Sequence, residues 1–75
     1  MKAKDYRYKN FVDNHLDKFG VDFDIQQIEN TSSFLFIDTK YGDVQYFPKS
    51  NKVQIHSQNK WINNGLDWLY KKLLS

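Results

Sequence analysis

The chain has 75 residues, no cysteine and a net charge of +2 from 11 basic and 9 acidic side chains. This length gives one domain, residues 1–75, near the lower limit for a self-sufficient core. The lack of cysteine excludes a disulfide framework and a thiolate metal site, and no apolar run approaches the roughly 20 residues that cross a bilayer. We therefore expect a soluble, cytoplasmic domain whose core depends on its many aromatic side chains.

Charge is distributed unevenly between the two halves of the chain. Residues 1–38 carry 5 basic and 7 acidic groups, whereas residues 39–75 carry 6 basic and 2 acidic groups. The basic second half is compatible with an anionic partner. The simpler interpretation is ordinary solubilising charge.

Residues 3–19 are predicted to form an amphipathic helix. Apolar side chains recur there with the i, i+3, i+4 and i+7 spacing of one helix face. The members of this stripe are Tyr8, Phe11, Val12, His15, Leu16 and Phe19. Gly20 is expected to end the helix in the left-handed conformation, which glycine adopts without steric cost.

Four strands are predicted next, over residues 21–28, 33–39, 43–47 and 52–56. The first alternates apolar and polar residues until Ile28, which predicts a bulge near Gln26 and Gln27 or a strand end there. The second is apolar on both faces, as in a central strand. Gly42 is the expected left-handed residue of the hairpin that follows, and Pro48 begins the next turn.

The closing segment, residues 59–73, has the strongest helical pattern. Its apolar stripe includes Trp61, Gly65 and Trp68, so both tryptophans are predicted to be core residues. Glycine inside a helix costs about 1 kcal/mol relative to alanine. We therefore expect a strand backbone or an aromatic ring to lie close over Gly65, flanked by the two indoles.

The predicted fold class is α+β, a single small domain in the order α-β-β-β-β-α. Short connections favour an antiparallel meander sheet, and both helices are most economically packed on one face of it. The other face would then expose apolar residues from 34–37 and either Tyr46 or Phe47, and such a patch usually marks a partner surface. The alternative places one helix on each face and leaves no patch.

No catalytic motif is present. The sequence lacks a glycine-rich phosphate loop, a nucleophile elbow, a zinc-protease motif and a calcium loop. Its two histidines, His15 and His56, do not have the spacing of metal ligands. We therefore predict a protein that is not an enzyme, with no cofactor and no metal, in which His15 packs in the helix stripe and binds a backbone carbonyl or a tyrosine hydroxyl.

Three acidic residues, Asp22, Asp24 and Glu29, mark the edge of the first predicted strand. They could engage a basic protein surface. The alternative is that they are solvated charges that protect the strand edge from aggregation.

Lysines at predicted turns lie close in sequence to aromatic residues. Lysines beside aromatics can neutralise phosphates and stack bases, but these cations include no arginine, which bidentate phosphate readers favour. The predicted binding residues are the aromatic anchors Tyr41, Tyr46 and Phe47 and a charged rim of Lys40, Lys49 and Lys52.

The order helix, antiparallel meander, helix is similar to that of double-stranded-RNA-binding domains. That family opens its second helix with a lysine cluster. Here the corresponding segment begins Asn59-Lys60-Trp61-Ile62, and its lysines, Lys71 and Lys72, lie at the far end. The resemblance therefore implies a shared topology and not the RNA-gripping motif.

The run YFPKSNKVQI at residues 46–55 resembles stretches of small phage-encoded proteins, anti-CRISPR proteins among them. Such proteins inhibit host defence by binding a nuclease or its recognition complex. The resemblance implies an inhibitor that occludes a protein partner in the host cytoplasm. The alternative is a small RNA- or DNA-binding domain, and the sequence is compatible with a monomer or a homodimer.

Overall fold

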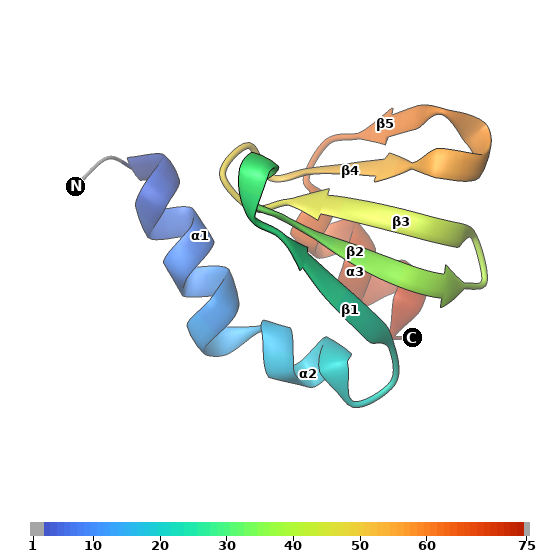
Figure 1. The fold of residues 1–75 in the computed structure, drawn as a ribbon, viewed down its shortest axis with the longest axis horizontal. Helices are drawn as coiled ribbons and strands as arrows, with labels where there is room; N and C mark the ends of the chain where they lie inside the picture. Colours follow the sequence, from blue (N-terminus) through green and yellow to red (C-terminus); the bar gives the residue numbers. More distant parts are fainter. Residues whose placement is uncertain (1–2, 75) are drawn as a thin grey trace.

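A computed structural model describes residues 3–74 and shows three helices and a five-stranded sheet (Figure 1). The helices are α1 (Ala3–Asn14), α2 (Leu16–Gly20) and α3 (Gly65–Leu73). The strands are β1 (Asp24–Ile28), β2 (Ser33–Thr39), β3 (Gly42–Phe47), β4 (Lys52–Ile55) and β5 (Lys60–Ile62). Two short 3₁₀ turns, η1 (Glu29–Thr31) and η2 (His56–Gln58), join β1 to β2 and β4 to β5.

The strands form one antiparallel meander in the order β1-β2-β3-β4-β5. The predicted α+β class and the succession of helix, meander and helix are confirmed. The bounds predicted for the second strand, residues 33–39, are those of β2. The sheet also contains a fifth strand, β5, in a segment that the helical pattern had assigned to the closing helix.

All three helices cover the same face of the sheet, as predicted. The Phe11 ring of α1 lies 5.1 Å from Phe34 and 4.8 Å from Tyr46, centroid to centroid. These two residues are cross-strand partners on β2 and β3. Gly65, at the start of α3, lies directly against Tyr46 and Val53. Phe19 of α2 packs on Phe36 of the same face, with ring centroids 5.5 Å apart. The opposite face therefore carries no helix from residues 3–74.

The core lies between the helices and this face, and aromatic rings fill much of it. The buried apolar residues are Phe11, Phe19, Phe34, Phe36, Val44, Tyr46, Val53, Ile55 and Leu69. Two members of the stripe predicted for the first helix, Phe11 and Phe19, are among them. The aromatic content therefore fills the core of a short chain, as its composition predicted.

The first predicted helix is interrupted at His15, which separates α1 from α2. The expected left-handed stop at Gly20 is wrong, because Gly20 is the last residue of α2 and its C-cap, Val21, has right-handed angles. The amides of Asp22 and Phe23 both donate to the Phe19 carbonyl. These bonds extend the turn, so β1 begins at Asp24 and not at residue 21.

β1 pairs with β2 without interruption from Asp24 to Ile28. The expected bulge or strand end near Gln26 and Gln27 is therefore wrong. The irregularity lies instead in β2, where the register shifts between Phe36 and Thr39. Asp38 occupies that position with φ 59°, and its amide donates to the Asp43 carboxylate at 3.1 Å.

Three of the hairpin turns end in the same way, with a left-handed residue that is not glycine. Ser32, Asn51 and Asn59 have φ between 49° and 54°. Each donates its amide to the carbonyl three residues earlier. Asparagine tolerates this conformation better than most residues. The β2–β3 hairpin uses Gly42 instead, with φ 82°, as predicted.

The closing helix is shorter than predicted and begins at Gly65. Asn59 and Asn64 are both left-handed, with φ of 49° and 53°, and each interrupts a continuous helix. The residues between them form β5, so Trp61 is a strand residue with 53% of its surface exposed. The prediction that Trp61 is a core residue is therefore wrong.

The close approach predicted at Gly65 is confirmed. A Cβ at this position would lie 2.8 Å from Val53 Cγ2, 2.9 Å from Tyr46 Cε1 and 3.0 Å from the Lys52 carbonyl carbon. Both an aromatic ring and a strand backbone therefore occupy the space that a side chain would need. Glycine is required here by packing and not by its backbone angles.

Asn51 secures this junction from the β3–β4 turn. Its carbonyl accepts the Gly65 amide at 2.8 Å. Its side-chain Oδ1 accepts the Leu66 amide at 3.0 Å and the Tyr46 hydroxyl at 3.1 Å. The first amides of a helix have no partner within the helix, so Asn51 caps α3 from a distant part of the chain.

We predict that Gly65→Ala lowers the free energy of unfolding by about 2 kcal/mol, because the new methyl group overpacks the helix–sheet junction. Urea denaturation followed by tryptophan fluorescence measures this. Gly20→Ala is the matched control: its Cβ would meet nothing within 4 Å, so we expect it to raise stability by a few tenths of a kcal/mol. Equal effects of the two substitutions would contradict the packing argument.

We predict that Asn51→Gly lowers the free energy of unfolding by about 1 kcal/mol, the usual cost of losing a helix cap. Glycine keeps the left-handed backbone but loses the acceptor oxygen. Asn51→Asp keeps that oxygen and places a negative charge near the start of α3, which the helix dipole favours. If both variants lose the same stability in urea denaturation, the cap is not the cause.

Candidate binding surfaces

The open face, defined as the sheet face opposite the helices, carries a mixed row of apolar and amide side chains. Register places one residue from each strand in this row. Its members, from β1 to β5, are Gln26, Leu35, Gln45, Gln54 and Trp61. Core residues such as Phe36 and Val44 alternate with them on the other face. The sequence predicted an apolar patch on the uncovered face, whereas this row mixes Leu35 and Trp61 with three glutamines.

Two aromatic rings on the open face form a cluster, which we call the aromatic pair. Phe47 of β3 and Trp61 of β5 lie with their ring centroids 5.4 Å apart. β4 runs between the two strands, so the rings meet across it. With Lys52 and Ser50 they line a shallow hollow of about 330 Å³. The pair therefore combines exposed aromatic surface with a cation at its border.

Hydrogen bonds hold the polar centre of the open face. Gln45 donates from Nε2 to Ser33 Oγ at 2.7 Å, and its Oε1 lies 3.0 Å from His56 Nε2. Ser33 Oγ also lies 2.6 Å from Thr31 Oγ1. Ser33 is fully buried although it is on the open face. This network ties the side chain of Gln45 on β3 to Ser33 on β2 and to His56 after β4.

The structure separates the predicted aromatic anchors. The sequence placed either Tyr46 or Phe47 on the uncovered face, and the structure has Phe47 there. Tyr46 is only 3% exposed and belongs to the core. The prediction that it is an aromatic binding residue is therefore wrong. Burial raises its pKa to about 12, and nearby Arg7 opposes that rise. Tyr41 is half-buried against Trp68 of α3, with ring centroids 5.2 Å apart.

The predicted basic rim is also divided. Lys52 borders the aromatic pair, and Lys49 lies in the adjoining β3–β4 turn. Lys40 is at the other end of β3, roughly 17 Å away for five residues of extended strand, with its Nζ 5.7 Å from the Tyr41 ring centroid. The six predicted residues therefore do not form one site. Phe47 and Lys52 lie beside Trp61, which the sequence prediction did not include among the binding residues. Lys49 lines a different hollow, with Tyr8 of α1 and Gln27 of β1.

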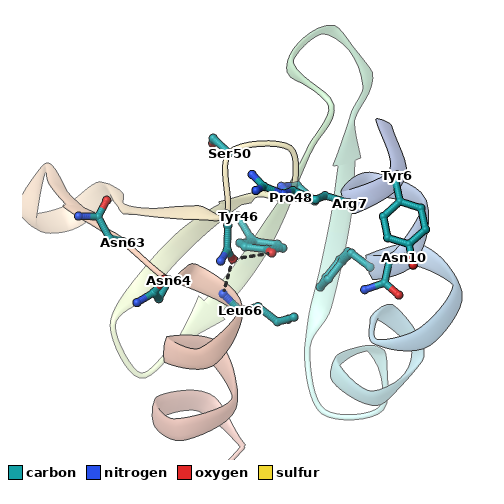
Figure 2. Close-up of a pocket in the computed structure, with 11 residues that line it drawn as sticks. Tyr6, Arg7, Asn10, Tyr46, Pro48, Ser50, Asn63, Asn64 and Leu66 are labelled. Carbon is teal, nitrogen blue, oxygen red and sulfur yellow. Dashed lines mark hydrogen bonds between the residues drawn. The ribbon is translucent and has the colours of Figure 1, made fainter. Parts of the chain in front are cut away.

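A second hollow, the polar cleft, lies between α1, the β3–β4 turn and the start of α3 (Figure 2). Its volume is about 450 Å³. Arg7 extends from α1 toward the turn and donates from Nη1 to the Lys49 carbonyl at 3.3 Å. The other lining residues are Tyr6, Asn10, Phe11, Tyr46, Pro48, Ser50, Asn51, Asn63, Asn64 and Leu66.

The polar cleft is lined mainly by amide, hydroxyl and apolar side chains. Among the described residues that line it there is no carboxylate, histidine or cysteine. The first two amides of α3, those of Gly65 and Leu66, already donate to Asn51 and are not free for an anion. The cleft is therefore a hydrogen-bonded junction between elements, with Arg7 as its one charged side chain.

His15 occupies the position that its helix pattern predicted. Its Nδ1 lies 2.7 Å from the hydroxyl of Tyr70 on α3, and either group can donate. The expected tyrosine partner is therefore confirmed. Burial lowers the His15 pKa below its ordinary value of 6.5, and the positive charge of Lys18 lowers it further. The bond joins the α1–α2 junction to α3.

The described residues contain no group of three or more His, Asp or Glu side chains that could hold a metal ion. Within the same part of the chain, no helix has both the length and the apolar character to span a membrane. No family model matches the chain, and neither a curated protein nor a solved structure matches it significantly. The resemblances to RNA-binding domains and to anti-CRISPR proteins stay predictions.

We predict that the His15 ring titrates below pH 6.5, and NMR titration of its ring protons measures this. The unfolded state then binds more protons than the folded state below that pH, so stability is lost as the pH falls through the lowered pKa. His15→Gln should flatten this part of the curve of unfolding free energy against pH. A His15 that titrates above 6.5 would contradict the desolvation argument.

Proposed function

We propose that this chain is a non-catalytic binding protein that engages a partner protein through the open face, with the aromatic pair at the centre of the contact. The observation that carries the proposal is the position of Trp61. It is a large apolar residue, more than half exposed, in contact with a second ring on a sheet face that no helix covers. Tryptophan is among the residues most enriched at the energetic centre of interfaces.

The composition of the open face supports a reversible protein contact. Apolar side chains such as Leu35 and Phe47 alternate there with glutamines, a mixture typical of non-obligate interfaces. Five strands hold these groups on a rigid surface, which reduces the entropy lost on binding. Lys52 lies at the border of the aromatic pair, where a charge guides association more than it holds the complex together.

An inhibitor that acts by occlusion fits this arrangement. Such a protein needs a firm contact surface and no reacting groups of its own. The resemblance of residues 46–55 to phage-encoded proteins suggests a host defence nuclease or nucleoprotein complex as the partner. That run includes Phe47, a member of the aromatic pair, and Lys52, which borders it.

A second candidate function is binding of single-stranded nucleic acid. The hollow formed by Phe47, Trp61 and Lys52 favours it, because bases stack on exposed rings and lysine neutralises phosphate. This alternative predicts an affinity for oligonucleotides that falls steeply with salt. An affinity that varies little with salt would remove it.

The test is affinity capture from lysate of the native host with the wild-type chain, Trp61→Ala and Phe47→Ala as baits. We expect the aromatic substitutions to abolish capture of a specific protein and to weaken its purified complex at least tenfold, about 1.4 kcal/mol. Isothermal titration measures the second effect.

Tyr6→Ala is the matched control, since Tyr6 is an aromatic residue of 65% exposure on α1, away from the open face. Binding that survives Trp61→Ala would overturn the assignment of this surface. Nuclease treatment of the lysate separates the two candidates: capture that is lost after nuclease treatment supports the nucleic-acid alternative.

A further inference from the structure

An apolar groove runs between α2 and β1, at the edge of the sheet farthest from the aromatic pair. We call it the edge groove, and its volume is about 560 Å³. Leu16 of α2 forms one side, Ile25 of β1 the other, and Phe34 lies between them. Val21, which is 82% exposed, lies at the rim. The hydrogen bond from Gln27 to the Tyr8 hydroxyl joins α1 to β1 near one end.

β1 borders this groove as an edge strand. Its only strand partner in the described part of the chain is β2, and Figure 1 shows its other side turned toward α1 and α2. An edge strand presents unpaired backbone donors and acceptors that can bind another extended chain. A groove beside such an edge receives alternate side chains of an added strand, which is how several peptide-binding domains work.

The carboxylates around the groove favour a basic partner. Asp17 and Asp24 line it, and a neighbouring hollow that shares Val21 and Asp24 is lined by Asp22 and Asp38. The two hollows together contain four carboxylates and one cation, Lys40. None of these carboxylates has an ion-pair partner among the described side chains.

We propose that the edge groove binds an extended segment of a partner protein that alternates apolar with basic side chains and pairs with β1 as a sixth strand. The apolar side chains enter the hollow between Leu16 and Ile25. The basic side chains lie against Asp17 and Asp24. This gives the acidic strand edge noted in the sequence a binding role, and it is independent of the open face.

The test uses a seven-residue peptide that alternates lysine and valine, and a second peptide with glutamate in place of lysine. We expect the lysine peptide to shift the backbone amide resonances of residues 16–27 of the full chain. The double variant Asp17→Lys/Asp24→Lys should lose about tenfold in affinity for the lysine peptide, as two rim ion pairs would give. It should bind the glutamate peptide more tightly than the wild type does.

Two controls make the experiment specific. Asp13→Lys/Asp67→Lys changes the net charge by the same amount at two exposed residues that line neither hollow, so it should keep most of the affinity for the lysine peptide. The lysine peptide with alternate amides N-methylated should not bind, because it cannot pair with β1. Trp61→Ala should bind the lysine peptide normally, which separates this proposal from the one for the open face.

Several results would overturn the proposal. They are an absence of shifts at millimolar peptide, shifts confined to the open face, equal losses in the two double variants, and binding of the N-methylated peptide. Sedimentation of the chain alone tests the competing occupant. A concentration-dependent dimer that protects the β1 amides from exchange would assign the edge to a second copy of the chain.

Discussion

The contact between α3 and the β3–β4 turn is the constraint on which the rest of the structure depends. Gly65 lies so close to Val53 and Tyr46 that no side chain fits between them, and Asn51 binds the first amides of α3. Tyr46 also joins this junction to α1 through its contact with Phe11. A nine-residue helix is too short to be stable alone, so tertiary packing and a cap from another element must hold it.

This junction also determines which face of the sheet stays uncovered. Since Tyr46 is committed to the helices, Phe47 must point to the opposite face. β4 and β5 follow the same alternation and bring Trp61 beside Phe47. The pairing register of the strands therefore determines both the core and the candidate binding surface. A shift of one residue in that register would move the core side chains to the open face.

The sequence predicted those parts of the fold that have a clear local pattern of apolar residues or a glycine in an unusual position. The stripe containing Phe11 and Phe19 indicated the first helix, the apolar run of residues 33–39 indicated β2, and the position of Gly65 on the buried side of a helix indicated a close approach. The sequence left Tyr46 and Phe47 as alternatives because both are large aromatics. Only the pairing of Tyr46 with Phe34 decides between them.

β5 was missed because a three-residue strand is too short to show its own period. Trp61, Gly65 and Trp68 happen to follow helical spacing, and this pattern concealed the strand. The signals that could have revealed it were Asn59 and Asn64, since asparagine often adopts the left-handed conformation that ends regular structure. The edge groove was likewise beyond prediction, because it depends on where α2 lies relative to β1.

The Asn64–Gly65 peptide has a chemical consequence for the lifetime of the protein. In flexible chains, the backbone nitrogen that follows an asparagine attacks the side-chain amide carbon. Ammonia leaves and a cyclic imide forms, most readily when the next residue is glycine. Here that nitrogen belongs to Gly65, which donates to the Asn51 carbonyl at 2.8 Å. The attack requires the junction to open, so the rate of this ageing reaction follows the local opening of α3.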